Sequence, residues 1–210
     1  MEKQTISKYI VPVFSEAQAG CGFFTDNYFI TSGHVTVRAN LPLVIYYQGK
    51  RIRLDMSNMV ECHYCHPLTA ESSCFDYAVF KVDGIDSPLR ISDHKPQEGE
   101  VYFCHTFNEE VTKNPQPGIP DIFTSCDEIV SLATEATIRK EVQGNFFAAD
   151  SKEILKEGNS GSPLLDSEGR VVGILQGGVS GTPCCVFQYA DIIKTTISDQ
   201  PTERPLCSAT

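Results

Sequence analysis

The sequence predicts an all-β fold in which two small antiparallel barrels follow one another along the chain. Short runs rich in β-branched and aromatic residues alternate with polar or glycine-bearing turns, which is typical of antiparallel strands. These runs fall into two blocks, separated by a polar, proline-bearing stretch at residues 84–99. Two blocks of strands favour two barrels, in domains at residues 1–95 and 96–210, although strand counting alone also allows a single sandwich.

The expected elements follow from these local patterns. In the first block the strand-like runs cover residues 9–14, 22–30, 43–47, 51–55 and 77–82. In the second block they cover residues 101–107, 137–142, 145–149, 162–165, 171–176 and 185–190. The segment DSEGR at 166–170 predicts a hairpin turn, residues 190–197 predict a short C-terminal helix, and the polar stretch 108–121 predicts a long surface loop.

The composition excludes some classes of function. The chain has 210 residues, 41% hydrophobic and 21% charged, which is ordinary for a globular protein with a real core. Its formal net charge of -10 repels phosphate backbones, so we expect no nucleic-acid partner. No apolar run approaches the roughly 20 residues that span a bilayer, so we expect no membrane partner. The oligomeric state stays open.

The number of cysteines indicates the cellular compartment in which the protein is expected. The nine cysteines are an odd number, so at least one is unpaired, and the N-terminus lacks the apolar core of a signal peptide. Free thiols fit a reducing compartment, and we therefore expect a cytoplasmic protein. A secreted chain whose signal peptide has been removed would look the same.

Three short segments carry reactive side chains in the order histidine, aspartate, serine. TSGHV follows an apolar run and contains His34, FDYAVF opens an apolar run with Asp76, and GNSGSP contains Ser160 between glycines. Each segment alone has an ordinary explanation: a solvated turn histidine, an aspartate that caps a turn, and a glycine-serine loop. Their joint occurrence in this order favours a catalytic group of three.

These segments resemble the signature motifs of the trypsin-like serine peptidases, and the resemblance extends from residue 9 to about residue 197. The GNSGSP form, followed by VGILQGG, is similar to that of bacterial glutamyl endopeptidases and, more loosely, of HtrA-like peptidases. The resemblance implies a chymotrypsin-like double barrel with its active site in the cleft between the barrels. The first barrel would carry His34 and Asp76, and the second would carry Ser160. It also implies a peptide or protein substrate and no cofactor.

The resemblance assigns a role to each of these residues. Ser160 would be the nucleophile, His34 the general base, and Asp76 the carboxylate that orients the imidazole and stabilises its charged form. A serine hydroxyl is almost fully protonated at neutral pH, and a neutral imidazole can remove that proton as attack proceeds. The backbone N–H groups of Gly158 and Ser160 would form the oxyanion hole, in a bend that glycine permits.

Departures from the family pattern bear on activation and specificity. Asn159 stands where many trypsins have an aspartate that pairs with a newly cut N-terminus, so we expect no need for zymogen cleavage. Glutamyl endopeptidases have a histidine where this chain has Leu175. The residues expected near the primary pocket carry no charge, which predicts a small or apolar P1 side chain; they are Ile154, Gln176, Gly178 and Cys185.

Two alternatives come from other classes of function. A pseudopeptidase would bind peptides in the cleft without cutting them. A zinc or redox module could instead centre on the CxxC motif of Cys62 and Cys65, with His66 or Cys74 as further ligands. A strong zinc prediction would need a second well-spaced cysteine pair, so we expect these residues to be structural and the chain to hold no metal.

Overall fold

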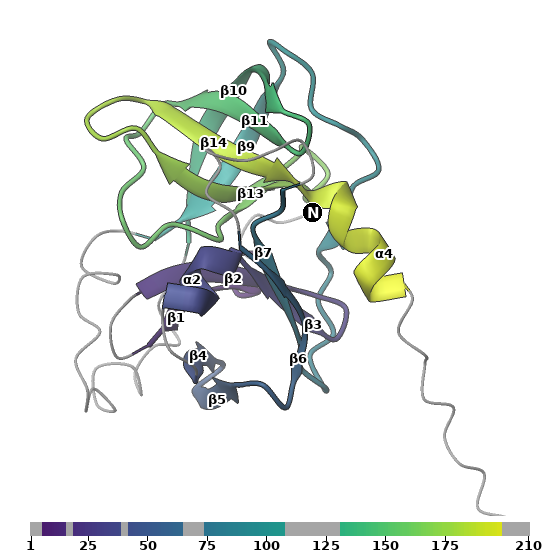
Figure 1. Cartoon of the computed structure of the whole chain (residues 1–210). Coiled ribbons are helices and arrows are strands. Elements are labelled where there is room, and N and C mark those ends of the chain that lie inside the picture. The colour runs from purple at the N-terminus through teal and green to yellow at the C-terminus, as the bar shows by residue number, and fades with distance from the viewer. Residues whose placement is uncertain (1–5, 16–18, 39–41, 65–73, 108–130, 199–210) are drawn as a thin grey trace, which may run out of the picture.

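The computed structural model describes residues 6–15, 19–38, 42–64, 74–107 and 131–198. Two seven-stranded β-sheets, one above the other in Figure 1, make up almost all of the regular structure in these ranges. A short helix, α2 (Gly33–Arg38), lies where the two sheets meet, and η2 (Ala190–Ile192) and α4 (Ile193–Ser198) follow the last strand. The predicted two-barrel, all-β architecture is confirmed. None of the described helices is long and apolar enough to cross a membrane.

The first sheet forms a half-barrel with the strand order β5-β4-β1-β2-β3-β7-β6. Its strands are β1 (Ile10–Phe14), β2 (Ala19–Thr25), β3 (Tyr28–Thr31), β4 (Leu43–Tyr47), β5 (Lys50–Leu54), β6 (Met59–His63) and β7 (Tyr77–Lys81). Fully buried phenylalanines pack in its hydrophobic core, among them Phe23, Phe24, Phe29 and Phe80. Their burial fixes the ends of β3 and β7, which lead to His34 and follow Asp76.

The second sheet closes into a six-stranded barrel, because β12 pairs with both β9 and β13. Its strands are β9 (Val101–Thr106), β10 (Leu132–Gln143), β11 (Phe146–Ser151), β12 (Pro163–Leu165), β13 (Arg170–Gly178) and β14 (Cys184–Tyr189). A seventh strand, β8 (Arg90–Ile91), adds to β13 in parallel. The chain therefore reaches the second sheet a few residues before the predicted boundary at 95 and 96, and that boundary stays a prediction.

Local predictions for the second barrel agree with the structure. The DSEGR segment is a hairpin turn, in which Asp166 N donates to Arg170 O at 2.9 Å and Gly169 has φ +81. The C-terminal helix forms as η2 followed by α4. Its Thr196 hydroxyl donates to the Glu61 carboxylate on β6, which holds the helix against the first sheet. The predicted surface loop at 108–121 lies outside the described residues.

Three parts of the first half differ from the prediction. The run at 22–30, predicted as one strand, is wrong: it contains the end of β2, a turn and most of β3, with Asp26 in the left-handed region at φ +48. Because Asp26 and Asn27 are good turn residues, the apolar runs on either side form a hairpin. Strand β6 and helix α2 were also missed, since six-residue helices and strands of mixed polarity give weak periodic signals.

Candidate active site

His34 is placed by the join between β3 and α2. The strand ends at Thr31, and the helix starts two residues later at Gly33, where a Cβ atom would lie 1.7 Å from the backbone oxygen of His63. Only glycine fits so close an approach, and it lets the histidine turn toward the start of β7. The His34 side chain is 14% exposed, which leaves one edge of the ring open to the seam between the barrels.

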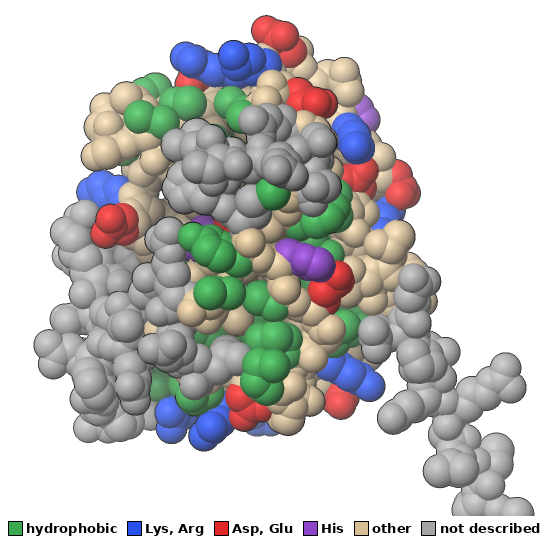
Figure 2. Space-filling model, in the orientation of Figure 1, with side chains coloured by type: hydrophobic (Ala, Val, Ile, Leu, Met, Phe, Trp, Pro, Cys, Tyr) green, Lys and Arg blue, Asp and Glu red, His purple; other side chains and the backbone are tan. Residues whose placement is uncertain are grey.

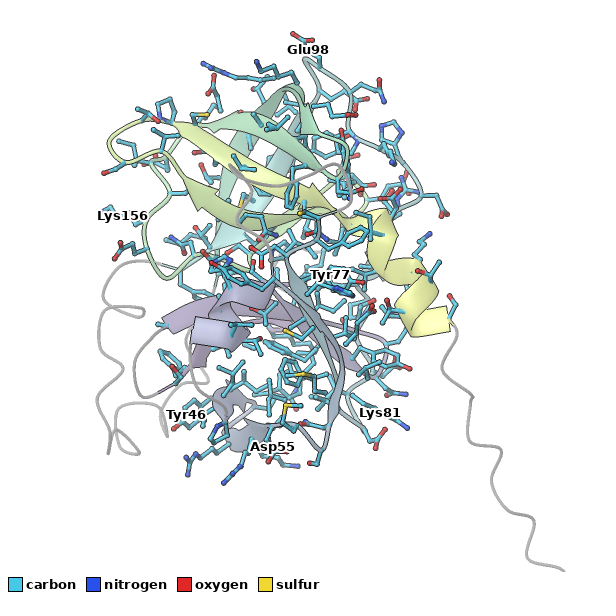
Figure 3. The ribbon with its side chains drawn as sticks, viewed as in Figure 1. Tyr46, Asp55, Tyr77, Lys81, Glu98 and Lys156 are labelled. Atoms are coloured by element: carbon cyan, nitrogen blue, oxygen red, sulfur yellow. The ribbon has the colours of Figure 1, made fainter. Side chains whose placement is uncertain are left out.

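Asp76 holds His34 through two hydrogen bonds. Its Oδ2 lies 2.8 Å from His34 Nδ1, and its Oδ1 accepts the backbone N–H of His34 at 2.7 Å. The carboxylate is 1% exposed, so water does not compete for it. One oxygen fixes the position of the histidine backbone and the other fixes the ring. Figure 3 shows Tyr77, the residue after Asp76, in the region where the two barrels meet.

Ser160 lies in a tight loop between β11 and β12. Gly158 and Gly161 have φ +89 and +91, and a Cβ on Gly161 would lie 2.0 Å from the backbone oxygen of Cys21. The loop docks on the first barrel, since Cys21 N donates to Ser160 O at 2.8 Å. The Ser160 oxygen also lies beside Gly20, whose other neighbour is the Val35 side chain of α2. Ser160 and His34 therefore sit on the same seam.

The Ser160 hydroxyl donates to the backbone oxygen of Gln176 at 3.1 Å. Within the described ranges, the His34 side chain hydrogen-bonds Asp76 and no serine. The structure thus joins His34 to Asp76 and brings Ser160 to the same seam without a direct Ser160–His34 hydrogen bond. Catalytic hydrogen bonds are often long or absent until substrate is bound.

The loop around Ser160 presents two unused backbone donors. Asn159 N donates to Lys156 O at 3.2 Å and Gly161 N donates to Leu175 O at 2.7 Å. Among the residues that the structure describes, no protein acceptor takes the N–H of Gly158 or of Ser160. Lys156, on the same loop, projects at the margin of the second barrel in Figure 3. Two unpaired N–H groups beside a serine are suited to bind an anionic oxygen.

Cys21 contacts Ser160 through its backbone, so the reactivity of its thiol bears on the site. Burial raises the pKa of the Cys21 thiol to about 12, so it stays protonated at neutral pH. Because only the thiolate is a strong nucleophile, Cys21 does not compete with Ser160. Burial also raises the pKa of Cys185 to about 12.

The four residues expected near the primary pocket have different environments. Gly178 faces Cys185 across the β13–β14 ladder, and Ile154 is 49% exposed on the loop before Ser160. Gln176 is buried and folds back on its own strand, its Nε2 donating to Ile174 O at 3.1 Å. The Cys185 side chain packs in the second barrel core, where its Sγ donates to Ala149 O at 3.2 Å. A Cβ on the adjoining Gly177 would meet no atom within 4 Å, so the space beside β13 is open there.

Only part of the CxxC region is described. Cys62 lies on β6 and Cys74 just before Asp76, both as free thiols, whereas Cys65 and His66 lie outside the described residues. The described residues contain no group of three His, Cys, Asp or Glu side chains that could hold a metal.

On the face seen in Figure 2, hydrophobic side chains and a histidine occupy the middle, and most charged side chains lie at the margin.

Sequence reasoning missed two polar residues that contact the site. Ser32 Oγ donates to Leu175 O at 2.8 Å, and Gln188 Oε1 accepts the backbone N–H of Asp76 at 2.5 Å. Ser32 lies next to the histidine motif and could have been flagged by that position. Gln188 is 112 residues from Asp76, and nothing in its local sequence indicates the contact.

A closed barrel and a half-barrel, meeting at a seam that carries a histidine, an aspartate and a serine, define a chymotrypsin-like hydrolase fold. The family model of the trypsin-like peptidase domain matches residues 20–174, which is well over half of the chain. The chain therefore belongs to the trypsin-like peptidases, and it is a hydrolase. A comparison with curated proteins found no match.

Solved structures of proteases share the fold. The active form of the Rv3671c protease from M. tuberculosis superposes with a TM-score of 0.65 at 16% identity, covering 96% of this chain and 84% of that one. The serine endoprotease from Yersinia pestis gives 0.66 at 19% identity, covering 93% and 65%. A Glu endopeptidase gives 0.65 at 16% identity, covering 93% and 91%. Likeness at such identities establishes the architecture, and one of these structures is a Glu endopeptidase, a kind of peptidase that the motifs resemble.

Proposed function

We propose that this peptidase is a serine endopeptidase that cleaves peptide bonds through an acyl-enzyme on Ser160. His34 is the general base, and Asp76 orients it. The observation that carries the proposal is the pair of hydrogen bonds that the buried Asp76 carboxylate accepts from His34, 2.7 and 2.8 Å long. They lie on the same seam between the barrels as Ser160. A solvated turn histidine would not need a buried carboxylate to fix both its backbone and its ring.

The reaction begins when the Ser160 hydroxyl leaves the Gln176 oxygen and donates to His34 Nε2. The proton moves to His34 as Oγ bonds to the substrate carbonyl carbon, and the carbonyl oxygen becomes negative. When the C–N bond breaks, His34 returns that proton to the leaving amine. A water molecule then repeats the sequence: its proton goes to His34, its oxygen attacks the ester, and the C–Oγ bond breaks as Ser160 is reprotonated.

The free N–H groups of Gly158 and Ser160 stabilise the negative oxygen in this scheme. Donors already oriented toward the developing charge cost no reorganisation, and each contributes about 3 kcal/mol to the transition state. The positive φ of Gly158 supports this role, because it orients the peptide toward the seam without a side-chain clash.

A substrate strand can add to the free edge of β13. The strand pairs with β12 no further than Ile174, and beyond Leu175 no described strand occupies that edge. The edge residues Gln176 to Gly178 include two glycines, which allow a peptide backbone to approach closely.

Asn159 Oδ1 already accepts a hydrogen bond from Phe107 N at 3.1 Å. The Asn159 side chain therefore has a partner within the chain, and we expect that activation does not require a newly cut N-terminus.

Specificity is inferred from the four residues predicted to lie near the primary pocket. Ile154, Gln176, Gly178 and Cys185 offer no charge to a substrate side chain, so a peptide library is expected to show preferred cleavage after small or apolar P1 residues. Ile154→Glu should raise relative cleavage after Lys and Arg, whereas Leu132→Glu, at an exposed site on β10, should not. Dominant cleavage after Glu, Lys or Arg by the unmodified protein would contradict the assignment.

The proposal is tested by labelling with a fluorophosphonate, which reacts with an activated serine. We expect one adduct, which mass spectrometry of the digested protein locates on Ser160. Ser162→Ala is the matched control, because its backbone bonds to Asn159 and Leu175 survive the change and labelling should persist. A folded protein that binds peptides but gives no adduct would instead be a pseudopeptidase.

A further inference from the structure

The segment that carries Asp76 belongs to the first barrel but is held by side chains of the second. Gln188 Oε1 on β14 accepts the Asp76 backbone N–H at 2.5 Å. Asn145 Nδ2, in the turn before β11, donates to the backbone oxygen of Cys74 at 3.0 Å. Tyr189 N in turn donates to Asn145 O at 3.0 Å, so both contacts belong to one rigid corner of the second barrel.

Successive side chains of β14 point to opposite faces of the sheet, and this directs Gln188 across the seam between the barrels. Its neighbours Phe187 and Tyr189 both point into the second barrel core, so Gln188 faces the other way, toward the first barrel. The side chain is 0% exposed, and within the described ranges its Nε2 has no hydrogen-bond partner. A buried amide that satisfies only one of its ends is costly, and the bond that it does make is to Asp76.

The same pair of strands also contacts the nucleophile. Gln188 stands opposite Ile174 in the β13–β14 ladder, and two residues further along β13 the Gln176 oxygen accepts the Ser160 hydroxyl. Adjacent strands of one barrel therefore touch Asp76 and Ser160. Any shift of β14 relative to the first barrel would move the carboxylate, and through it the His34 ring, relative to Ser160.

We propose that Gln188 is a positioning residue that aligns Asp76, and hence His34, with Ser160 across the seam. The inference rests on the proposed function and adds a residue to it. Gln188 touches neither substrate nor the reacting atoms, so it acts through Asp76. Displacement of a catalytic group by about 1 Å is enough to reduce turnover about 100-fold.

The test is Gln188→Leu, which keeps the size of the side chain and removes the acceptor. We expect kcat to fall about 10- to 100-fold with KM changed less than about twofold. We also expect the pH profile of kcat/KM to change, because the hydrogen bond between the displaced carboxylate and the imidazole is altered. The low-field proton resonance of the His34 Nδ1–H···Asp76 bond should shift or disappear, and this readout does not depend on turnover.

Thr25→Val provides the matched control. Thr25 is nearly as deeply buried, and its Oγ1 donates to Leu89 O at 3.0 Å in the segment between β7 and β8. The variant therefore loses a buried hydrogen bond that involves neither Asp76 nor Ser160. It should lower the melting temperature like Gln188→Leu while the pH profile and the low-field resonance stay unchanged. Gln188→Asn, one methylene shorter, should show the same changes as Gln188→Leu in weaker form.

The outcomes separate the inference from the proposed function. An unaltered kcat, pH profile and low-field resonance in folded Gln188→Leu or Gln188→Asn would overturn the positioning role and leave the peptidase proposal standing. If the unmodified protein is not labelled by fluorophosphonate, yet Gln188→Leu loses the low-field resonance, the proposed function fails and the positioning contact stands. If neither variant folds, Gln188 is required for folding and the assignment is wrong.

Discussion

Replacement of Ser160 by alanine is expected to lower kcat/KM for the best peptide substrate by about 10⁴-fold or more. In the proposed mechanism the variant lacks the atom that forms the acyl-enzyme, so water must attack the substrate directly. The fold should be unaffected, because the one hydrogen bond lost is that from Oγ to Gln176 O, and the backbone bond from Cys21 N to Ser160 O remains. Steady-state kinetics and a thermal melt measure the two effects.

Thr182→Ala is the control that shows whether the loss of activity is specific to Ser160. Thr182 Oγ1 also donates to a backbone oxygen, that of Val179, at 2.8 Å, but in the exposed turn between β13 and β14. This variant should retain kcat/KM within about threefold. If Ser160→Ala kept more than about one hundredth of the activity, the nucleophile would have to be sought elsewhere.

Local sequence was enough to propose His34, Asp76 and Ser160 as the reactive residues, because two of the three motifs contain the glycines that shape the backbone at the site. Gly33 permits the approach that turns His34, and Gly158 and Gly161 permit the bend at Ser160. Because these glycines are adjacent to the reactive residues, a short sequence motif is enough to indicate the backbone conformation there. The DSEGR hairpin was predictable for the same reason, since its geometry depends on the turn residues alone.

The contacts that join the barrels could not be predicted in this way. Gln188 meets Asp76, and Ser32 meets Leu175, across separations of 112 and 143 residues. Such pairs depend on the register between strands. A single polar residue in an otherwise apolar strand does not predict which element its side chain will contact. Strand β6 was missed for a related reason: all five of its residues are only partly buried, so its pattern of polarity does not alternate.

The residues predicted near the primary pocket could be predicted from the sequence only in part. Gly178 and Cys185 were both predicted to lie near the primary pocket, and in the structure they face each other across the β13–β14 ladder. The bulge between Leu175 and Gly177 shifts the register of that ladder, so side-chain directions beyond it do not follow from simple alternation. The inward position of the Cys185 side chain is a consequence of tertiary packing, which composition does not encode.

Replacement of Asp76 by asparagine is expected to lower kcat by about 10⁴-fold in a folded protein. The amide has one acceptor and one donor where the carboxylate has two acceptors. Its oxygen will accept the His34 backbone N–H, which must be satisfied, and its NH₂ group will then face His34 Nδ1. Nδ1 has to become an acceptor, so the ring proton moves to Nε2, and His34 can no longer take a proton from Ser160.

The fold of this variant is preserved because the Asp76 backbone still donates to Gln188. Kinetics at neutral pH and the loss of the low-field Nδ1–H resonance measure the change. Asp55→Asn is the control, since that carboxylate accepts bonds from Ser57 and Arg53 at the far, exposed end of the first sheet, and kcat should stay within about twofold. A kcat for Asp76→Asn within tenfold of the unmodified protein would mean that the tautomer of His34 does not depend on Asp76, and the role given to the carboxylate would fail.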